Sequence, residues 1–285
     1  MRSDVALSRR ALLAELSAEL AAAGVPQPRR EALRVWSQLL AALPAEVLVD
    51  GETQVEHDTV HALRGAVRRR AGGEPLAHVT GRIGFRDLVL TSDHRALIPR
   101  PETEGLVDLL LARVRTGRAA DVGTGGGCLA LSLASEGAFD QMLAVDLSAP
   151  ALAQAEQNRV ALGARVRLLR GDLCAPLRSD SLDAVVSNPP YLTEAEYASL
   201  DPSVKRWEPA SALVSGPDGL RATVRLLQET RSVLRVGGWL ALEVDCTRAA
   251  AVAGQAAALG WVDVAIHADL FGRERYLLAR RSAQP

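Results

Sequence analysis

The chain has 285 residues, 48% of them hydrophobic, which is enough for a large core or for two domains. Its formal net charge of −1 gives no strong attraction to nucleic acid or to an anionic membrane. No apolar run reaches the roughly 20 residues of a membrane span, and the start is unlike a signal peptide, so we expect a cytoplasmic protein. The three cysteines lie far apart and away from histidine, which predicts that no metal is bound.

Three amphipathic helices are predicted in the first part of the chain. They span residues 4–23, 28–43 and 57–71, with apolar residues at helical spacing and Gly or Pro near the ends. The second is expected to bury Trp36, Leu40 and Leu43 and to stop at Pro44. An arginine run at 68–70 ends the third helix, where the helix dipole favours positive charge. The simpler interpretation of this run is a solvated helix end, and the alternative is a basic contact patch.

The next segment changes character and predicts a connection between two domains. Residues 73–98 carry glycine and proline and contain two β-like runs, HVTGRIGF and DLVLT, which favour a hairpin. We therefore expect a helical substrate-recognition domain at 1–72, a β-hairpin linker at 73–98 and a catalytic domain at 99–285.

From Ala119 onward, short apolar strands alternate with helices. Strands are predicted at AADVG, QMLAVD, RVRLLRGD, LDAVVSN and GGWLALEVD, and helices at about 128–136, 149–162, 218–235 and 247–259. This alternation is typical of an α/β fold in which helices cover both faces of a parallel sheet. The last two strand-like runs, WVDVAIHAD and RERYLLARR, are joined by a loop too short for a crossover helix, so we expect a C-terminal antiparallel strand pair.

A glycine-rich turn, DVGTGGG at 121–127, joins the first of these strands to its helix, and glycine lets the backbone approach a ligand closely. The second strand ends in Asp146, where nucleotide-binding α/β folds place an acid that accepts hydrogen bonds from ribose; the alternative is a helix N-cap. The third strand ends in Asp172 and Leu173, where the acid would accept from an adenine amine and the leucine would cover the ring. The spacing departs from the dinucleotide pattern GxGxxG, so a smaller adenosine-containing ligand fits equally well.

The segment SNPPYL at 187–192 follows the fourth strand. Two prolines after Asn188 cannot continue a sheet, because each lacks an N–H and fixes its own φ, so the chain must form a rigid, polar-tipped corner. Together, the glycine loop, the acids and this corner give the chain a pattern that resembles the S-adenosylmethionine-dependent methyltransferases. Its NPPY motif is similar to the motif of those members that methylate planar nitrogens. The resemblance implies that Asn188 and the Pro189 carbonyl orient a substrate NH₂ group, with Tyr191 stacking on it or walling the pocket.

The whole chain resembles the release factor glutamine methyltransferases, which methylate the glutamine side-chain amide in the Gly-Gly-Gln tip of peptide-chain release factors. The matching stretches are GEPLAHVTGRIGF at 73–85, IPRPETE at 98–104, DVGTGGG at 121–127, VSNPPYL at 186–192 and RWEPASAL at 206–213. The resemblance implies a Rossmann-like class I methyltransferase sheet and S-adenosylmethionine as cofactor. It also implies a monomer whose partner is the release factor, with no stable nucleic-acid or membrane partner.

By the same resemblance, the site residues fall into two groups. Those expected to bind the cofactor are Gly123, Thr124, Gly125, Gly126, Gly127, Asp146, Asp172, Leu173 and Asn188, and those expected to be catalytic are Asn188, Pro189, Pro190 and Tyr191. Pro99, Arg100 and Glu102 would lie near the cofactor or the entering substrate. Two features depart from the family: the fifth strand ends in EVDC at 243–246 where a glycine is expected soon after the glutamate, and Leu173 stands at a commonly aromatic position.

Two other functions use the same features. An adenine-amino methyltransferase acting on DNA or RNA would use the same NPPY geometry, but it needs base flipping and a basic binding face, which the net charge of −1 disfavours. A non-catalytic cofactor-binding adaptor would be expected to have lost Asn188 or the glycines, and both are present.

Overall fold

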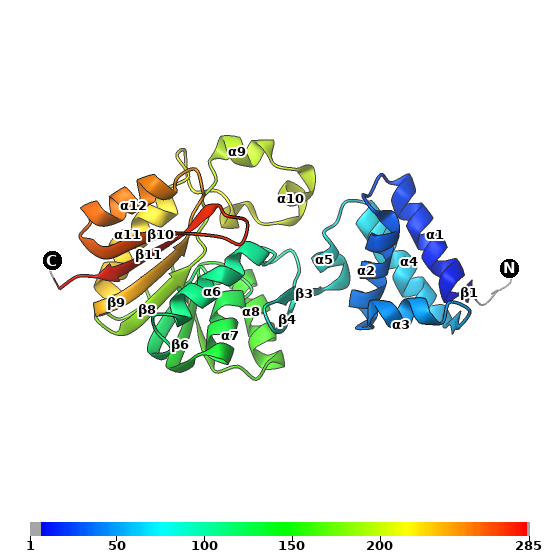
Figure 1. Ribbon diagram of the computed structural model, residues 1–285, viewed down its shortest axis with the longest axis horizontal. Coiled ribbons are helices and arrows are strands. Elements are labelled where there is room, and N and C mark those ends of the chain that lie inside the picture. The colour runs from blue at the N-terminus through cyan, green and yellow to red at the C-terminus, as the bar shows by residue number, and fades with distance from the viewer. Residues whose placement is uncertain (1–6, 284–285) are drawn as a thin grey trace. The chain divides into compact units, whose positions relative to one another are not determined.

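The computed structural model describes residues 7–283, and the chain divides into two compact units, Met1–Arg82 and Ile83–Pro285 (Figure 1). The first unit is helical and the second is α/β. This division differs from the predicted boundaries at 72 and 98, because the first ten residues of the expected linker belong to the helical unit. Within residues 7–283, the structure contains no helix with the length and apolar character of a membrane span.

The helical unit is built around three long helices. Its elements are β1 (Leu7–Ser8), α1 (Arg9–Ala22), α2 (Pro28–Leu40), α3 (Pro44–Val49), β2 (Gln54–Val55), α4 (His57–Ala71) and α5 (Leu76–Thr80). Leu16, Trp36 and Leu63, one from each long helix, are buried together in its core. The helix predicted at 4–23 is confirmed at Arg9–Ala22; the prediction is wrong for Leu7 and Ser8, which form β1, and its start at 4–6 lies outside the described residues.

The helix predicted at 28–43 ends early, at Leu40. Ala41 adopts a left-handed conformation with a φ of 52°, which breaks the helix. Pro44, predicted as a stop, instead begins α3, because proline is favoured at the first helical position, where its missing N–H is not needed. Leu40 and Leu43, predicted to be buried, are therefore 41% and 65% exposed.

Residues 73–82 fold onto the helical unit instead of forming part of a linker. The run HVT, predicted as strand, is the end of α5, which follows Pro75 and stops at the left-handed Gly81. Val79 is buried in the helical core, so the apolar residues of this run serve a helix rather than a strand. The hairpin itself is confirmed as β3 (Arg82–Phe85) and β4 (Leu88–Thr91).

The arginine run at 68–70 is not simply a solvated helix end. Arg69 donates from Nε to the Glu74 carboxylate at 2.8 Å, and from Nη2 and Nη1 to two backbone carbonyls of α5 at 3.0 and 3.2 Å. Arg70 donates from Nε to Glu31 at 2.6 Å. Both carboxylates are buried, so the two arginines tie α4 to α5 and to α2. The Arg69 side chain is still 50% exposed, so the alternative of a basic contact patch stays a prediction.

The α/β unit contains a seven-stranded sheet and the helices that cover it. After the hairpin, its elements are η1 (Pro101–Thr103), α6 (Glu104–Leu111), β5 (Thr116–Val122), α7 (Cys128–Glu136), β6 (Ala138–Asp146), α8 (Ala149–Ala161), β7 (Val166–Arg170), β8 (Leu182–Ser187), α9 (Glu194–Ser199), α10 (Pro202–Trp207), η2 (Ala210–Ala212), α11 (Arg221–Val233), β9 (Leu234–Glu243), α12 (Ala249–Ala258), β10 (Trp261–Ala268) and β11 (Glu274–Arg281). The sequence did not predict α9 or α10.

The strand order is β10-β11-β9-β8-β5-β6-β7. Strands β5 to β9 are parallel, and the predicted antiparallel C-terminal pair is confirmed, with β11 inserted between β9 and β10. Successive β5 residues face opposite sides: Ala119 packs in the core with α6 and α7, and Ala120 packs with α11 and α12.

The order of the strands determines where a ligand binds. The chain runs outward from β5 to β6 and β7 and then returns to β8 on the other side of β5. In open α/β sheets, the loops that leave the carboxyl ends of two such strands diverge and form a binding crevice. The loops after β5 and β8 are the glycine loop and the NPPY corner.

Arg69→Ala should destabilise the helical unit by about 1–3 kcal/mol, because it leaves the buried Glu74 carboxylate without its guanidinium partner. The neighbouring Arg68 is a matched control: it is exposed and donates to the Arg64 carbonyl at 3.3 Å, so Arg68→Ala should change stability by less than about 0.5 kcal/mol. Amide hydrogen exchange of peptides from α4 and α5 measures both. Equal protection in the two variants would contradict a structural role for Arg69.

Candidate active site

The glycine loop joins β5 to α7. Gly123, Gly125 and Gly127 have φ values of 76°, 55° and 91°, in the left-handed region that favours glycine. At Gly126 the restriction is steric, because an added Cβ would lie 2.7 Å from Nε2 of Gln154. A side chain at any of the four would strain the backbone or displace a neighbour, so the shape of the loop requires glycine.

Asp146, at the end of β6, holds the glycine loop from the neighbouring strand. Its carboxylate accepts hydrogen bonds from the Gly125 N–H and the Ser148 N–H, both at 2.8 Å. The N-cap of α8 is Ser148, whose hydroxyl accepts from the Ala151 N–H, so the interpretation of Asp146 as an N-cap is wrong. Each carboxylate oxygen has two lone pairs, which leaves Asp146 able to accept from a ribose hydroxyl while it holds the loop.

Asp121, near the end of β5, is fully buried next to the loop. Its Oδ2 accepts from the Thr124 hydroxyl at 2.6 Å and from the Ala130 N–H at 3.1 Å, whereas Oδ1 has no hydrogen-bond partner among residues 7–283. Burial raises the pKa of Asp121 to about 7; the two hydrogen bonds oppose this shift and the charge of Asp146 adds to it. The carboxylate of Asp121 is therefore buried beside the glycine loop with one oxygen unpaired.

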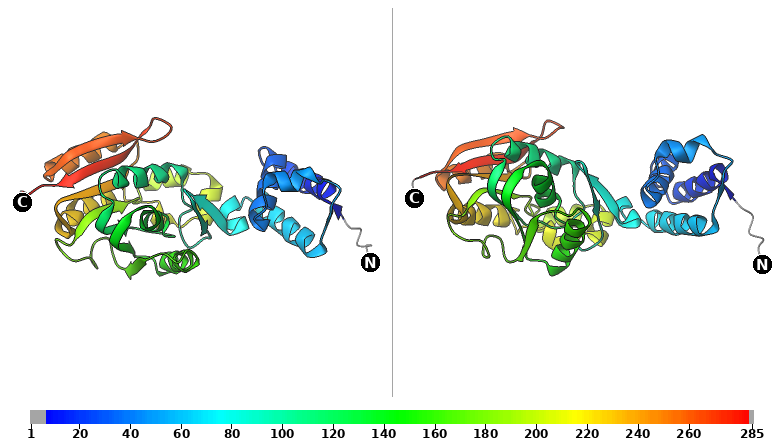
Figure 2. Two further views of the ribbon diagram at one scale, coloured as in Figure 1. Left: turned by 60° about the horizontal axis from the view of Figure 1, so that its bottom comes forward. Right: turned by 90° about the horizontal axis from the view of Figure 1, so that it is seen from below.

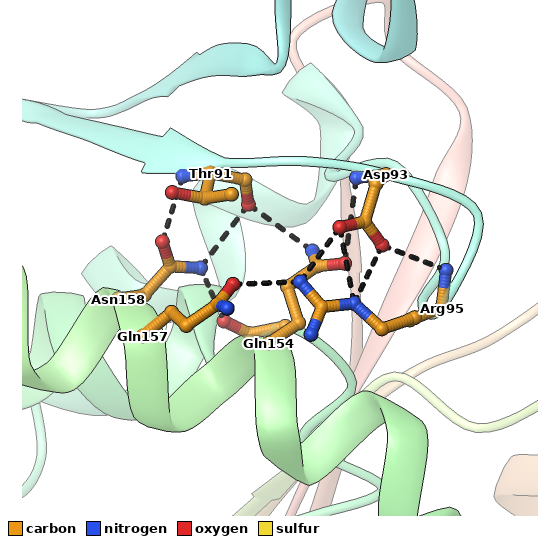
Figure 3. Close-up of polar contacts among 7 residues, drawn as sticks. Thr91, Asp93, Arg95, Gln154, Gln157 and Asn158 are labelled. Atoms are coloured by element: carbon orange, nitrogen blue, oxygen red, sulfur yellow. Dashed lines mark hydrogen bonds and ion pairs between the residues drawn. The ribbon is translucent and has the colours of Figure 1, made fainter.

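A strap of residues 91–96 is fastened to α8 beside the glycine loop (Figure 3). Asn158 accepts from the Thr91 N–H at 2.7 Å and donates to the Thr91 carbonyl at 3.2 Å and to the Gly126 carbonyl at 2.9 Å. Gln154 donates to the Thr91 carbonyl at 3.1 Å. The buried Asn158 amide therefore connects the strap at Thr91 to the glycine loop at Gly126. Sequence reasoning missed both residues, although two amides four positions apart on a buried helix face are a usable signal.

The two residues predicted at the adenine end occupy the turn after β7. Leu173 has a left-handed φ of 46° and packs against the core on the α11 side. The Asp172 carboxylate pairs with Arg225 of α11 at 3.0 Å. The Gly171 N–H donates to the Asp146 carbonyl at 3.0 Å, which brings this turn to the end of β6. Asp172 therefore lies at the expected sheet edge with its carboxylate engaged by arginine, and its adenine role stays a prediction.

The NPPY corner begins where β8 ends, beside the end of β5, and Ser187 donates its hydroxyl to the Val122 carbonyl at 2.5 Å. Asn188 donates from Nδ2 to the Thr103 hydroxyl at 3.1 Å, and this hydroxyl donates to Oε2 of Glu243 at 2.6 Å. A hydroxyl has one hydrogen, so Thr103 must accept from Asn188 while it donates to Glu243. This relay, Glu243–Thr103–Asn188, turns Nδ2 inward and leaves Oδ1 of Asn188 available as an acceptor.

The carboxylate and the hydroxyl of the relay are buried. Glu243 is buried at the end of β9, and burial raises its pKa, against the hydrogen bond from Thr103 and the positive charge of Arg275. Tyr191 is half-buried, and burial, aided by the charge of Glu243, raises its pKa to about 12. Electrostatic and hydrogen-bond interactions are stronger in such an environment than in water. Glu243, the first residue of the EVDC sequence, is thus the buried acceptor at the end of the relay.

Two further charged residues, not singled out from the sequence, hold the loops around the corner. Glu208, from the RWEPASAL stretch, is buried and accepts from the Arg100 guanidinium at 2.6 Å and the Ile98 N–H at 3.1 Å. Arg248 binds the Glu196 carboxylate at 2.6 Å and the Asp218 carbonyl at 2.9 Å. The sequence offered a reason to select Glu208, because it lies in the RWEPASAL stretch that resembles the family, but it offered no reason to select Arg248.

The carboxyl edge of the sheet therefore brings the glycine loop, Asp146 and Asn188 together. Its acidic side, from Asp121 to Asp146, fits a cationic adenosine-containing ligand, and its NPPY side fits a planar NH₂ group. Of the other expected residues, Arg100 points to Glu208, and Glu102 pairs with Arg273 at 3.1 Å. Across residues 7–283, no cluster of three or more His, Cys, Asp or Glu side chains has the geometry of a metal site.

Comparison with known proteins gives matches over both units. The model of the PrmC N-terminal domain matches residues 11–81, and that of the methyltransferase small domain matches residues 101–201. A release factor glutamine methyltransferase from Deinococcus radiodurans is 40% identical, over 96% of this chain and 98% of its own length. One from Escherichia coli is 35% identical, over 89% of this chain and 92% of its own length.

Solved structures share the fold of the α/β unit. A methyltransferase from Pyrococcus furiosus has a TM-score of 0.52 at 19% identity and covers 68% of this chain and 88% of its own. The T. Thermophilus 16S rRNA N2 G1207 methyltransferase, in complex with AdoMet and guanosine, has a TM-score of 0.50 at 18% identity, covering 70% and 49%. At these identities the structural similarity establishes the class I methyltransferase fold and says nothing about the substrate.

The raised pKa of Asp121 predicts a specific dependence of stability on pH. Between its ordinary pKa near 3.8 and its folded value near 7, the folded state holds a proton that the unfolded state has lost. The free energy of unfolding should therefore fall as pH rises through this window, by an amount on the order of 4 kcal/mol for this group. Asp121→Asn keeps an acceptor for Thr124 and removes the titration, so its stability should fall less over the same range.

Urea unfolding of both proteins between pH 4 and 8 measures this difference. Glu243 contributes a shift of the same sign to both proteins, so the difference between the two pH profiles isolates Asp121. Parallel profiles would contradict a buried, titrating Asp121.

Proposed function

This chain belongs to the release factor glutamine methyltransferase family, and from that membership we infer that it transfers a methyl group from S-adenosylmethionine to the glutamine side-chain amide nitrogen of a peptide-chain release factor. We propose that the acceptor lies in the Gly-Gly-Gln loop of that factor. The observation that carries the assignment of the site is the Glu243–Thr103–Asn188 relay, because it presents one hydrogen-bond acceptor at the corner where a substrate amide must be gripped.

An amide nitrogen is a poor nucleophile, since its lone pair is delocalised into the carbonyl. Oδ1 of Asn188 and the Pro189 carbonyl would accept the two N–H groups of the glutamine amide and so fix the plane of its NH₂ group. Fixing that plane aims the nitrogen π-face along the line of displacement, and the gain comes mainly from orientation. Pro190 stiffens the corner, and Tyr191 would wall the pocket against water.

The residues on the other side of the crevice fit S-adenosylmethionine, which supplies an electrophilic methyl group on a sulfonium when bound. The left-handed glycines at 123, 125 and 127 open the backbone to the ligand. Asp146 would accept from the ribose hydroxyls. When ionised, Asp121 would place negative charge beside the loop, and a bound cationic ligand would favour that ionised form.

The helical unit would serve the choice of substrate more than the chemistry. It contains none of the site residues, and the PrmC N-terminal domain model matches it at residues 11–81. We further propose that the enzyme acts as a monomer in the cytoplasm, where release factors meet the ribosome.

Mass spectrometry of a recombinant release factor, after incubation with this protein and S-adenosylmethionine, tests the function. The expected product carries one added methyl group on the glutamine of Gly-Gly-Gln, and a DNA or RNA oligonucleotide in the same assay should remain unmodified. Asn188→Ala should lower single-turnover transfer by about 30- to 1000-fold, equivalent to ~2–4 kcal/mol, with much less effect on cofactor affinity. An unmodified glutamine with the parent protein would contradict the proposed function.

The relay predicts an effect at a residue that need not touch either substrate. Thr103→Val should lower the transfer rate by about 10- to 100-fold, because Asn188 loses the partner that fixes its orientation. Thr103→Ser keeps the hydroxyl and should stay within about threefold of the parent rate. Cofactor affinity, measured by calorimetry, should change little in either variant. A valine variant as fast as the serine variant would show that Asn188 is held by other contacts.

A further inference from the structure

The turn between β10 and β11 exposes two large apolar side chains. Leu270 is 86% and Phe271 is 68% exposed. The chain has only three phenylalanines, and the other two, Phe85 and Phe139, pack against the core of the α/β unit. In both views of Figure 2 this turn projects beyond the neighbouring ribbons of its unit. An aromatic placed at a projecting turn contributes nothing to the core, and exposed apolar groups of this kind mark interaction sites.

The turn is rigidly built, so these side chains are not simply part of a loose loop. The Asp269 side chain is fully buried and accepts hydrogen bonds from the Phe271 N–H at 2.9 Å and the Arg273 N–H at 3.0 Å. It also accepts from Nε of Arg275 at 2.9 Å. Gly272, with a φ of 77°, completes the reversal. A buried carboxylate therefore holds Leu270 and Phe271 outward, and preorganised contacts of this kind cost little entropy on binding.

The turn lies at the same edge of the sheet as the proposed site. Strand β11 runs antiparallel to β9 and pairs Tyr276 with Glu243, so the chain before β11 lies beyond the carboxyl end of β9. The Tyr276 hydroxyl donates to the Glu102 carbonyl, and the Arg273 guanidinium binds the Glu102 carboxylate at 3.1 Å. Glu102 is followed directly in the chain by Thr103 of the relay.

An unbroken series of contacts thus leads from the corner to the apolar turn. It runs from Asn188 to Thr103, through the backbone to Glu102, and on to Arg273. The Arg273 guanidinium in turn lies 5.2 Å from the centre of the Phe271 ring. A protein that delivers one glutamine side chain to Asn188 must cover the surface around that point, and this turn belongs to that surface.

We propose that Leu270 and Phe271 form an apolar docking contact for the release factor, on the part of its folded surface that flanks the glutamine loop. The inference rests on the proposed function and adds a binding surface to it. An apolar pair flanked by charged groups, here Arg273 and Glu102, matches the arrangement of a protein interface, in which an apolar centre is bordered by a polar rim. The release factor is the occupant we infer, because the turn continues directly into the site that its glutamine must reach.

The test compares Leu270→Ser and Phe271→Ser, singly and together, with the control Val236→Ser. Val236 is 59% exposed but lies near the start of β9, at the opposite edge of the sheet. Each protein is assayed on an intact release factor and on a short synthetic peptide containing Gly-Gly-Gln. In the double variant the KM for the intact factor should rise about tenfold or more, with kcat on the factor, rates on the peptide and cofactor affinity unchanged. The control should match the parent in every assay.

Binding of the release factor, measured by calorimetry, should weaken in parallel with KM. A double variant that binds and methylates the intact factor as the parent does would overturn the docking contact alone. A parent that methylates neither factor nor peptide would overturn the proposed function and the docking contact with it. Sedimentation provides the last criterion: a parent dimer that becomes monomeric in the double variant would assign the turn to a contact between copies and overturn the proposal.

Discussion

The hydrogen bond from the Thr103 hydroxyl to the buried carboxylate of Glu243 is the interaction on which the geometry of the site depends. A carboxylate buried at the end of a strand is costly unless donors surround it. Thr103 supplies such a donor and, having only one hydrogen, becomes an acceptor for Asn188. The electrostatic requirement of one buried group thereby sets which end of an amide side chain faces the substrate. Removal of either partner would leave the other unsatisfied, so the relay is stable only as a whole.

Other carboxylates of the α/β unit organise loops in the same way; Glu208 and Asp269 are buried, and Asp146 is half-buried. Asp146 gathers two backbone N–H groups and shapes the glycine loop, Glu208 holds the IPRPETE stretch, and Asp269 folds the β10–β11 turn. Each accepts hydrogen bonds from loops that have no secondary structure to satisfy them. Short loops at the carboxyl edge therefore acquire fixed shapes without packing into a core, which leaves the edge open to ligands.

Much of the fold could be predicted because its signals are local. The parallel strands, the helices after them and the NPPY corner follow from hydrophobic runs, glycine and proline. The failures concern residues whose role depends on distant partners. Pro44 serves equally well as a stop or a start, the HVT run became helix because it packs on the helical unit, and Arg69 is determined by Glu74. Within the site, the sequence predicted the positions of the glycine loop and Asp146 at the ends of two strands, whereas the arginine partner of Asp172 was not predictable.

The relay also explains why the NPPY sequence alone does not define a site. The oxygen and nitrogen of an asparagine amide are almost equal in size, so the two orientations of Asn188 pack equally well against the same prolines. Only a hydrogen-bond partner distinguishes them, and that partner comes from a segment 85 residues earlier, which is itself set by a residue 140 positions further along. The IPRPETE stretch, the NPPY corner and the glutamate that ends β9 therefore form one functional unit. A chain with NPPY but without a hydroxyl at the position of Thr103 would need another group to orient its asparagine.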